Sequence, residues 1–91
     1  MTPSKRDANE SELITLWRKV GAVCIEMDRN AAFDLLVLHR GEVYLVEVKA
    51  EGKRMRLTQR ERERCTEVEA VGVPYNIVQT ADDALKMLGL R

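Results

Sequence analysis

A carboxylate and an ammonium group lie two residues apart in the segment 43–50, for which the alternation of residues predicts a β-strand. Glu47 and Lys49 share one face of that strand, because successive side chains point to opposite faces. Both faces are otherwise largely apolar, so the strand is expected to be covered on both sides, where isolated charges are costly. These two charges are tolerated if they pair with each other, or if they coordinate a metal ion and face a phosphate group.

Asp34 raises the same question on a neighbouring segment, because it lies within the apolar run 33–38. The residues Arg40 and Gly41 predict a tight turn, so segments 33–39 and 43–50 should pair as an antiparallel hairpin. Counting back from this turn brings Asp34 close to Glu47 and Lys49. Two carboxylates and an amine then converge, and hard cations such as Mg²⁺ are commonly held by one or two carboxylates with water and phosphate oxygens.

Periodicity and turn residues predict the elements that position these groups. The expected order is αβββαβα, in a single α/β domain spanning residues 1–91 with a mixed central sheet flanked by helices. The central strand is expected to be 33–39, since it is dense in Leu and Val. The predicted helices are 8–20, 58–71 and a short one after Thr80, and the predicted strands are 22–28, 33–39, 43–50 and 74–79.

Capping signals support the three helix starts. The pairs Asp7 with Glu10, Thr58 with Glu61, and Thr80 with Asp83 each have the spacing of a capping box or cap. Apolar residues then recur at helical spacing: Leu13, Leu16, Trp17 and Val20 in the first helix, and Cys65, Val68 and Val71 in the second.

Size and composition favour a globular protein. The 91 residues are 45% hydrophobic and 33% charged, which favours neither disorder nor a membrane span, and no apolar run reaches the roughly 20 residues that cross a bilayer. The first ten residues are polar, so we expect no signal peptide and a cytoplasmic location, in a bacterial or phage-infected host cell. Because a chain of this length buries a modest share of its surface, we expect a homodimer. Cys24 and Cys65 are expected to be reduced core residues.

The formal net charge is zero, yet residues 49–64 hold seven basic residues against three acidic ones. Lys53, Arg54 and Arg56 fall in a loop beside the proposed site, where they could contact DNA phosphates, although charged loops are usually just solvated. Arg60 follows on the second helix and is a further candidate for phosphate contact. It alternates there with acidic residues, together with Arg62 and Arg64, so part of this charge is expected to be used in intrahelical pairs.

Several of these features resemble a known nuclease family. Asp34, twelve intervening residues and then Glu47-Val48-Lys49 resemble the signature of the PD-(D/E)xK nuclease superfamily. Glu10-x-x-Leu13, the basic loop and Leu57-x-Gln59 at the start of the next helix further resemble the virus-type replication-repair nuclease family, VRR-NUC. The resemblance covers nearly the whole chain.

The resemblance implies a restriction-endonuclease-like fold and a Mg²⁺- or Mn²⁺-dependent endonuclease acting on branched DNA, such as flaps or four-way (Holliday) junctions, as a homodimer in DNA replication, recombination or repair. By the same resemblance, Asp34, Glu47 and the main-chain carbonyl of Val48 ligate the metal. Glu10 lies beside them, Lys49 acts on water, and Gln59 lies close to that lysine and the substrate. The spacing of Glu10, Leu13 and Trp17 agrees, since it puts all three on one helix face.

One position departs from the family pattern, which has proline before the first aspartate where this chain has Phe33. No ligand is lost by this change, but the local backbone geometry at Asp34 is left open. Glu12 is an alternative to Glu10 as the acidic residue that the first helix contributes.

Simpler interpretations stand beside the catalytic one. Glu47 and Lys49 could form an ordinary ion pair, Glu10 could be only a helix cap, and Gln59 could be a solvated residue of the first turn. Two other functions stay open: a non-catalytic DNA-binding module or subunit working with a larger enzyme, and a purely structural subunit. We expect His39 at the surface of the turn, and Trp17 in the core or a dimer interface.

Overall fold

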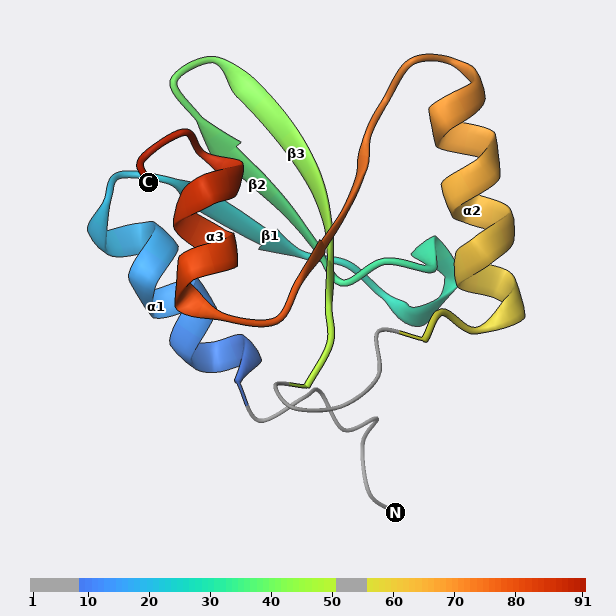
Figure 1. The fold of residues 1–91 in the computed structure, drawn as a ribbon, viewed down its shortest axis with the longest axis horizontal. Coiled ribbons are helices and arrows are strands. Elements are labelled where there is room, and N and C mark those ends of the chain that lie inside the picture. The colour runs from blue at the N-terminus through green and yellow to red at the C-terminus, as the bar shows by residue number, and fades with distance from the viewer. Residues whose placement is uncertain (1–8, 51–55) are drawn as a thin grey trace.

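The computed structural model describes residues 9–50 and 56–91, and the elements follow the order α β β β α β α (Figure 1). A short 3₁₀ turn, η1, lies between the first two strands. The predicted element order is thereby confirmed. The bounds are α1 Glu10–Lys19, β1 Val23–Glu26, η1 Arg29–Ala31, β2 Leu35–His39, β3 Glu42–Val48, α2 Gln59–Ala70, β4 Tyr75–Val78 and α3 Ala81–Met87.

The four strands form one mixed sheet in the spatial order β1-β2-β3-β4. The pairs β1–β2 and β2–β3 are antiparallel, and β4 runs parallel to β3. A parallel neighbour needs a crossover connection, which α2 supplies. Helices α1 and α3 lie together on one side of the sheet and α2 lies on the other (Figure 1). The expected central position of β2 is confirmed, since β2 has a neighbour on each side.

The main core lies between the sheet and the pair α1 and α3. Trp17 is fully buried there, and its indole N–H donates to the carbonyl of Ala84 at 3.2 Å, so the ring joins the two helices. Val46 and Val48 meet this core from β3. Successive side chains of a strand point to opposite faces, so Glu47, which lies between these two valines, points to the side of the sheet where α2 lies.

The β2–β3 hairpin has a two-residue turn in which both residues have positive φ, 50° for Arg40 and 81° for Gly41. This combination is the mark of a type I′ turn, whose twist matches that of the strands. The turn pairs His39 with Glu42 and sets the register of the hairpin. The surface position predicted for His39 is wrong, because this residue ends the buried series Leu35, Val37, His39 on the core face and is only 5% exposed.

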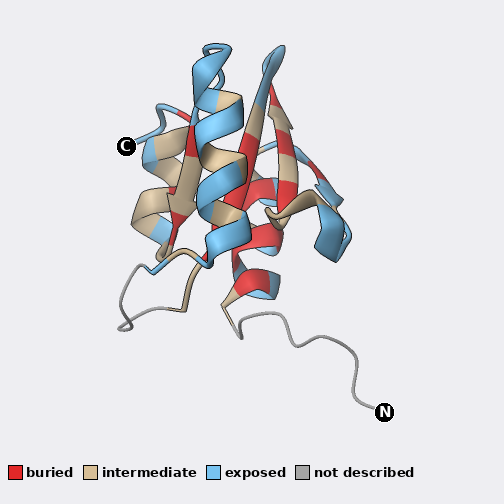
Figure 2. Cartoon of the chain, turned by 90° about the vertical axis from the view of Figure 1, so that its right-hand side faces the viewer, coloured by how far each residue is buried: buried red, intermediate tan, exposed pale blue. Residues whose placement is uncertain are grey.

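Helix α2 covers its side of the sheet lightly, and none of its residues is buried. Figure 2 shows exposed residues along its outer surface and buried ones along the strands behind it. Cys65 and Val68 are half-buried, as expected for an inner stripe, but Val71 is 78% exposed. The prediction for Val71 is wrong because the helix ends at Ala70 and the chain reverses at Gly72, which has φ 86°.

Two further features bear on the expectations from composition. Cys24 is buried and Cys65 is half-buried, and both are free thiols. No helix within residues 9–50 and 56–91 has the length and apolar character needed to cross a membrane.

The hairpin turn generates a test of the fold. Asn adopts left-handed backbone angles more readily than Arg does, so Arg40→Asn should raise the free energy of unfolding by up to about 1 kcal/mol. Gly41→Val should lower it by about 1–2 kcal/mol, because a β-branched residue is strained at positive φ. Urea unfolding at equilibrium measures both changes. If both variants unfolded at the same urea concentration as the unmodified chain, the assigned turn would be contradicted.

Candidate active site

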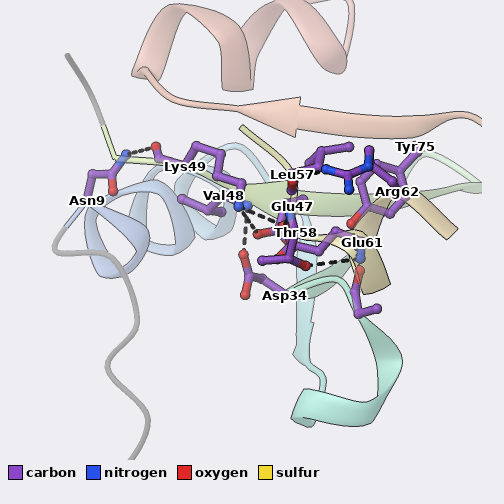
Figure 3. Close-up of polar contacts among 11 residues, drawn as sticks. Asn9, Asp34, Glu47, Val48, Lys49, Leu57, Thr58, Glu61, Arg62 and Tyr75 are labelled. Carbon is purple, nitrogen blue, oxygen red and sulfur yellow. Dashed lines mark hydrogen bonds and ion pairs between the residues drawn. The ribbon is translucent and has the colours of Figure 1, made fainter. Parts of the chain in front are cut away.

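The polar residues gather where β2 begins and β3 ends. Asp34 immediately precedes β2, Glu47 is the second-last residue of β3, and Lys49 follows that strand. Leu35 pairs with Val46, so Asp34 lies opposite Glu47 one step further along the hairpin. The structure thus brings Asp34, Glu47 and Lys49 to one end of the sheet (Figure 3).

The carboxylate of Asp34 continues the hairpin beyond the last backbone pair. The Asp34 N–H donates to the carbonyl of Val46 at 2.9 Å, and its carbonyl accepts from the N–H of Met27 at 2.9 Å. Its side-chain Oδ2 then accepts from the N–H of Val48 at 2.7 Å. The carboxylate thus takes the place that a backbone carbonyl would have if the hairpin pairing continued. The N–H and carbonyl of a strand residue point to the same side, so the Val48 carbonyl is directed to the same edge as Asp34.

Glu47 is 4% exposed and lies beside a lysine that has two carboxylate partners. The Nζ of Lys49 is 3.3 Å from Glu47 Oε2 and 2.8 Å from Glu61 Oε1. Glu61 is itself fixed by the predicted capping box of α2, which is present. Its Oε1 accepts from the N–H of Thr58 at 2.9 Å, and its own N–H donates to the Thr58 hydroxyl at 3.1 Å.

Sequence reasoning assigned Glu61 only to the helix cap, and the structure adds it to the cluster around Lys49. The spacing of Thr58 and Glu61 is the one signal in the sequence that singles out this residue. Gln59, which the family resemblance places near Lys49, donates to Glu63 Oε2 at 3.2 Å on the exposed side of α2. Residues two apart on a helix face different ways, and Glu61 holds the position beside the lysine.

Crowding of carboxylates changes the protonation of the cluster. Burial, the charges of Asp34 and Glu61, and a hydrogen bond with Glu61 raise the pKa of Glu47 to about 9, against a smaller lowering by Lys49. Burial alone would lower the pKa of Lys49, but its hydrogen bond with Glu61 and the two carboxylate charges raise it. Burial opposes ionisation of Glu61 as well, yet its bonds from Lys49 and Thr58 lower its pKa. A cation at Glu47 would relieve this repulsion.

Glu10 reaches the same end of the molecule from α1. It is 2% exposed and shares the inner stripe of that helix with Leu13 and Trp17, whereas the alternative residue Glu12 is exposed. The N-cap of α1 is Asn9, so the helix starts later than the predicted pairing of Asp7 with Glu10 requires. Asp7 itself lies outside the described residues.

Asn9 ties the start of α1 to the ends of two strands. Its Nδ2 donates to the carbonyl of Lys49 at 3.1 Å (Figure 3). It also donates to the carbonyl of Gln79 at 2.7 Å. Its Oδ1 is buried and accepts no hydrogen bond within the described part of the chain. Glu10 follows directly in the chain, so its position relative to Lys49 is restrained by the backbone of Asn9.

These donors fit a hard divalent cation that also uses solvent or substrate oxygens. Two carboxylates and a main-chain carbonyl meet the demand of Mg²⁺ or Mn²⁺. Within the described ranges, no three His, Cys, Asp or Glu side chains form a metal cage by themselves. A cation here would therefore need water or phosphate oxygens to complete its coordination.

The predicted DNA contacts are only partly within the described residues. Arg56 and Arg60 are exposed around the start of α2, while Lys53 and Arg54 lie outside the described residues. Arg62 Nη1 donates to the carbonyl of Leu57 at 2.8 Å, and Arg64 pairs with Glu67 at 2.9 Å. Of these arginines, Arg64 therefore shows the intrahelical pairing expected from the sequence.

Comparison with known proteins identifies the fold. A solved structure described as a VRR_NUC domain superposes with a TM-score of 0.70 at 21% sequence identity, covering 88% of this chain and 89% of that chain. No family model and no curated protein matches the chain by sequence. The fold expected from the resemblance to the VRR-NUC family is confirmed, and at this identity the likeness shows the fold alone.

The raised pKa of Glu47 predicts how stability of the metal-free protein depends on pH. Its ordinary value of 4.5 applies to the unfolded chain and about 9 to the folded one, so the folded chain binds more protons between these limits. The free energy of unfolding should therefore fall as pH rises from about 5 to about 9. Lys49 titrates above this window and Glu61 below it, because their pKa values shift outward.

Urea unfolding in EDTA at several pH values measures this slope, and Glu47→Gln should flatten it because an amide does not titrate. Glu69→Gln, on the exposed surface of α2, is the matched control and should keep the slope of the unmodified chain. An equally steep fall in Glu47→Gln would show that another group is responsible.

Proposed function

We propose that this chain is a divalent-metal-dependent DNA endonuclease of the VRR-NUC family that hydrolyses phosphodiester bonds. The observation that carries the proposal is the meeting of Asp34, Glu47 and Lys49 at one end of the sheet. The fold shared with a VRR_NUC domain supports it independently of these side chains. Burying such a cluster is costly for a structural subunit, so its retention favours chemistry.

Asp34, Glu47 and the carbonyl of Val48 would hold Mg²⁺ or Mn²⁺, with Glu10 supporting the site from α1. The ion, when bound, supplies positive charge that polarises a phosphoryl oxygen and eases deprotonation of water. Asp34 would keep its orientation through the hydrogen bond from the Val48 N–H, at 2.7 Å. Glu47 would exchange its proton for the cation, so we expect metal affinity to rise with pH.

Lys49 would orient the attacking water and stabilise negative charge on the phosphate. An ammonium group has three donors on a flexible stem, so it needs anchors to point in one direction. With Glu47 occupied by the metal ion, Glu61 remains as the anchor at 2.8 Å, and the remaining donors can face the substrate. Gln59, on the outer side of α2, would contribute only by contacting the DNA.

The basic residues near α2 would bind the phosphate backbone. Arg56 and Arg60 are exposed beside the site, and Lys53 and Arg54 belong to the same basic stretch of sequence. Such contacts position DNA without selecting its sequence. Selection of branched DNA, as flaps or four-way junctions in replication, recombination or repair, is proposed from the family resemblance. A cytoplasmic location in a bacterial or phage-infected host cell stays a prediction.

The first test of this function is metal-dependent cleavage of labelled branched and linear DNA. The unmodified protein should cleave with Mn²⁺ or Mg²⁺ and not with EDTA. Asp34→Ala and Lys49→Ala should each lower the rate by about 100-fold or more, because each removes a group that acts on the reacting phosphate. Single-turnover cleavage rates measure the loss.

Glu69→Ala removes an exposed carboxylate of α2 and should leave cleavage unchanged. Equal cutting by Asp34→Ala would refute the assigned site. Salt-sensitive binding without any metal-dependent product would instead favour the non-catalytic DNA-binding module, in which Lys49→Ala leaves binding nearly intact.

We also propose that two copies associate through the sheet face that α1 and α3 do not cover. Val23, Ile25 and Val43 are 56%, 45% and 62% exposed, and all three flank the half-buried Leu36 and Leu38 of β2 on this face. A contiguous apolar surface of this kind marks an interaction site, and a chain of this size gains stability by covering it. A second copy would also provide two active sites for two strands of DNA.

Light scattering after size-exclusion chromatography tests this association. The unmodified protein should have the mass of two chains, and the double variant Val23→Lys, Val43→Lys should have the mass of one, because buried charges oppose the interface. Val71→Lys places the same charge on an exposed residue beyond α2 and should remain dimeric. A dimer that persists in the double variant would place the interface elsewhere.

A further inference from the structure

The turn that leads into Asp34 has an unusual backbone. The 3₁₀ turn η1 begins after Asp28, whose side chain accepts from the N–H of Asn30 at 2.9 Å. It ends at Ala32, which has φ 60° and ψ 31°, in the left-handed region. L-residues other than Asn and Asp rarely adopt these angles, and the next residue is Phe33, where a proline would restrict the backbone. The residue types in this turn therefore do little to hold the left-handed conformation of Ala32.

Two side chains from distant parts of the chain hold it instead. The Tyr75 hydroxyl, on β4, donates to the carbonyl of Ala32 at 2.6 Å. Arg64, on α2, donates through Nε to the carbonyl of Ala31 at 2.9 Å and through Nη2 to that of Asn30 at 3.3 Å. Three successive carbonyls are thus bound before the chain reaches Asp34.

The Tyr75 hydroxyl is well placed as a permanent donor. Its residue is 7% exposed, and its backbone is fixed in the sheet by pairing with Leu45 of β3. Burial and the nearby charges of Glu47, Glu61 and Asp34 raise the pKa of the Tyr75 phenol, which keeps its proton. That proton is used on the Ala32 carbonyl rather than on a substrate.

Asp34 lies two residues beyond the Ala32 carbonyl, and its backbone is fixed on both sides. Its N–H bonds to Val46 and its carbonyl to Met27, so the turn 28–33 is closed between anchored ends and its conformation sets the direction in which the chain enters Asp34. We propose that Tyr75 and Arg64 are positioning residues that hold η1 and Ala32 so that the carboxylate of Asp34 faces the cation site. This inference rests on the proposed metal-dependent function.

The matched pair Tyr75→Phe and Tyr44→Phe tests the proposal. Each change removes one oxygen, but Tyr44 is packed on the opposite face of β3 from the cluster. In the absence of DNA, Tyr75→Phe should bind Mn²⁺ about tenfold more weakly, as expected when a group that orients a ligand is lost. Tyr44→Phe should bind Mn²⁺ as the unmodified protein does. Isothermal titration calorimetry with Mn²⁺ measures both affinities.

Cleavage kinetics separate positioning from a general loss of stability. In Tyr75→Phe the Mn²⁺ concentration for half-maximal rate should rise in proportion to the weaker binding, while saturating Mn²⁺ restores most of the rate. Unchanged Mn²⁺ affinity in a Tyr75→Phe protein with a lowered unfolding temperature would overturn the proposal, because the hydroxyl would then be only structural.

Arg64→Lys provides a second, independent arm. Lysine keeps the charge but cannot reproduce the guanidinium fork, so the Mn²⁺ affinity of this variant should fall. The control, Glu67→Gln, removes only the exposed ion pair of Arg64 and should leave the Mn²⁺ affinity unchanged. If neither the Arg64 variant nor the Tyr75 variant lost Mn²⁺ affinity, the positioning role would be overturned, but the proposed function would not. If the unmodified protein neither bound Mn²⁺ nor cleaved DNA, the proposed function would fail, and this inference with it.

Discussion

The crowding of carboxylates around the ammonium group of Lys49 is the interaction on which the rest of the structure depends. Glu47 is almost inaccessible, Asp34 is its neighbour across the hairpin, and Glu61 approaches the same lysine from α2. Burial disfavours the charged form of Glu47, and repulsion from the charges of Asp34 and Glu61 adds to this effect, which is why the pKa of Glu47 rises. The fold must hold these groups together against that repulsion, and it does so with backbone hydrogen bonds to Asp34 and the capping box that fixes Glu61.

Helix α2 illustrates how the site and the fold share the same contacts. It has no buried residue, so apolar packing holds it to the sheet only weakly, and most of its residues are charged. Its attachments include the bond from Lys49 to Glu61 and those from Arg64 to the carbonyls of η1. The same helix thus contributes to both sides of the cluster, with the lysine on one side and the turn before Asp34 on the other. Contacts of this kind are directional, so they specify where α2 lies more narrowly than an apolar interface would.

Local patterns in the sequence are sufficient to predict the order of helices and strands and to predict that Asp34 lies opposite Glu47. Alternation and the Arg40-Gly41 turn set the hairpin register, and the register alone brings those two residues opposite each other. Contacts between distant segments were not accessible in this way. Glu61 satisfied a helix cap and offered no sign of a second partner, while the contacts of Tyr75 and Arg64 with the η1 turn depend on how β4 and α2 dock. The surface position predicted for His39 is wrong because the inward alternation of β2 continues to the last residue of the strand, next to the turn.

Residue 33, before Asp34, is not a proline, and the contacts of Tyr75 and Arg64 restrain the backbone of this turn in its place. Proline restricts the backbone locally and does so even in the unfolded chain, whereas hydrogen bonds from Tyr75 and Arg64 act only once β4 and α2 are in place. The conformation of the turn in this chain therefore depends on tertiary structure that forms around it. A left-handed Ala32 is strained by itself and persists because its carbonyl has a buried donor at 2.6 Å. The geometry of Asp34 is in this sense a property of the whole sheet and its crossover helix, and the segment 28–34 would not retain it in isolation.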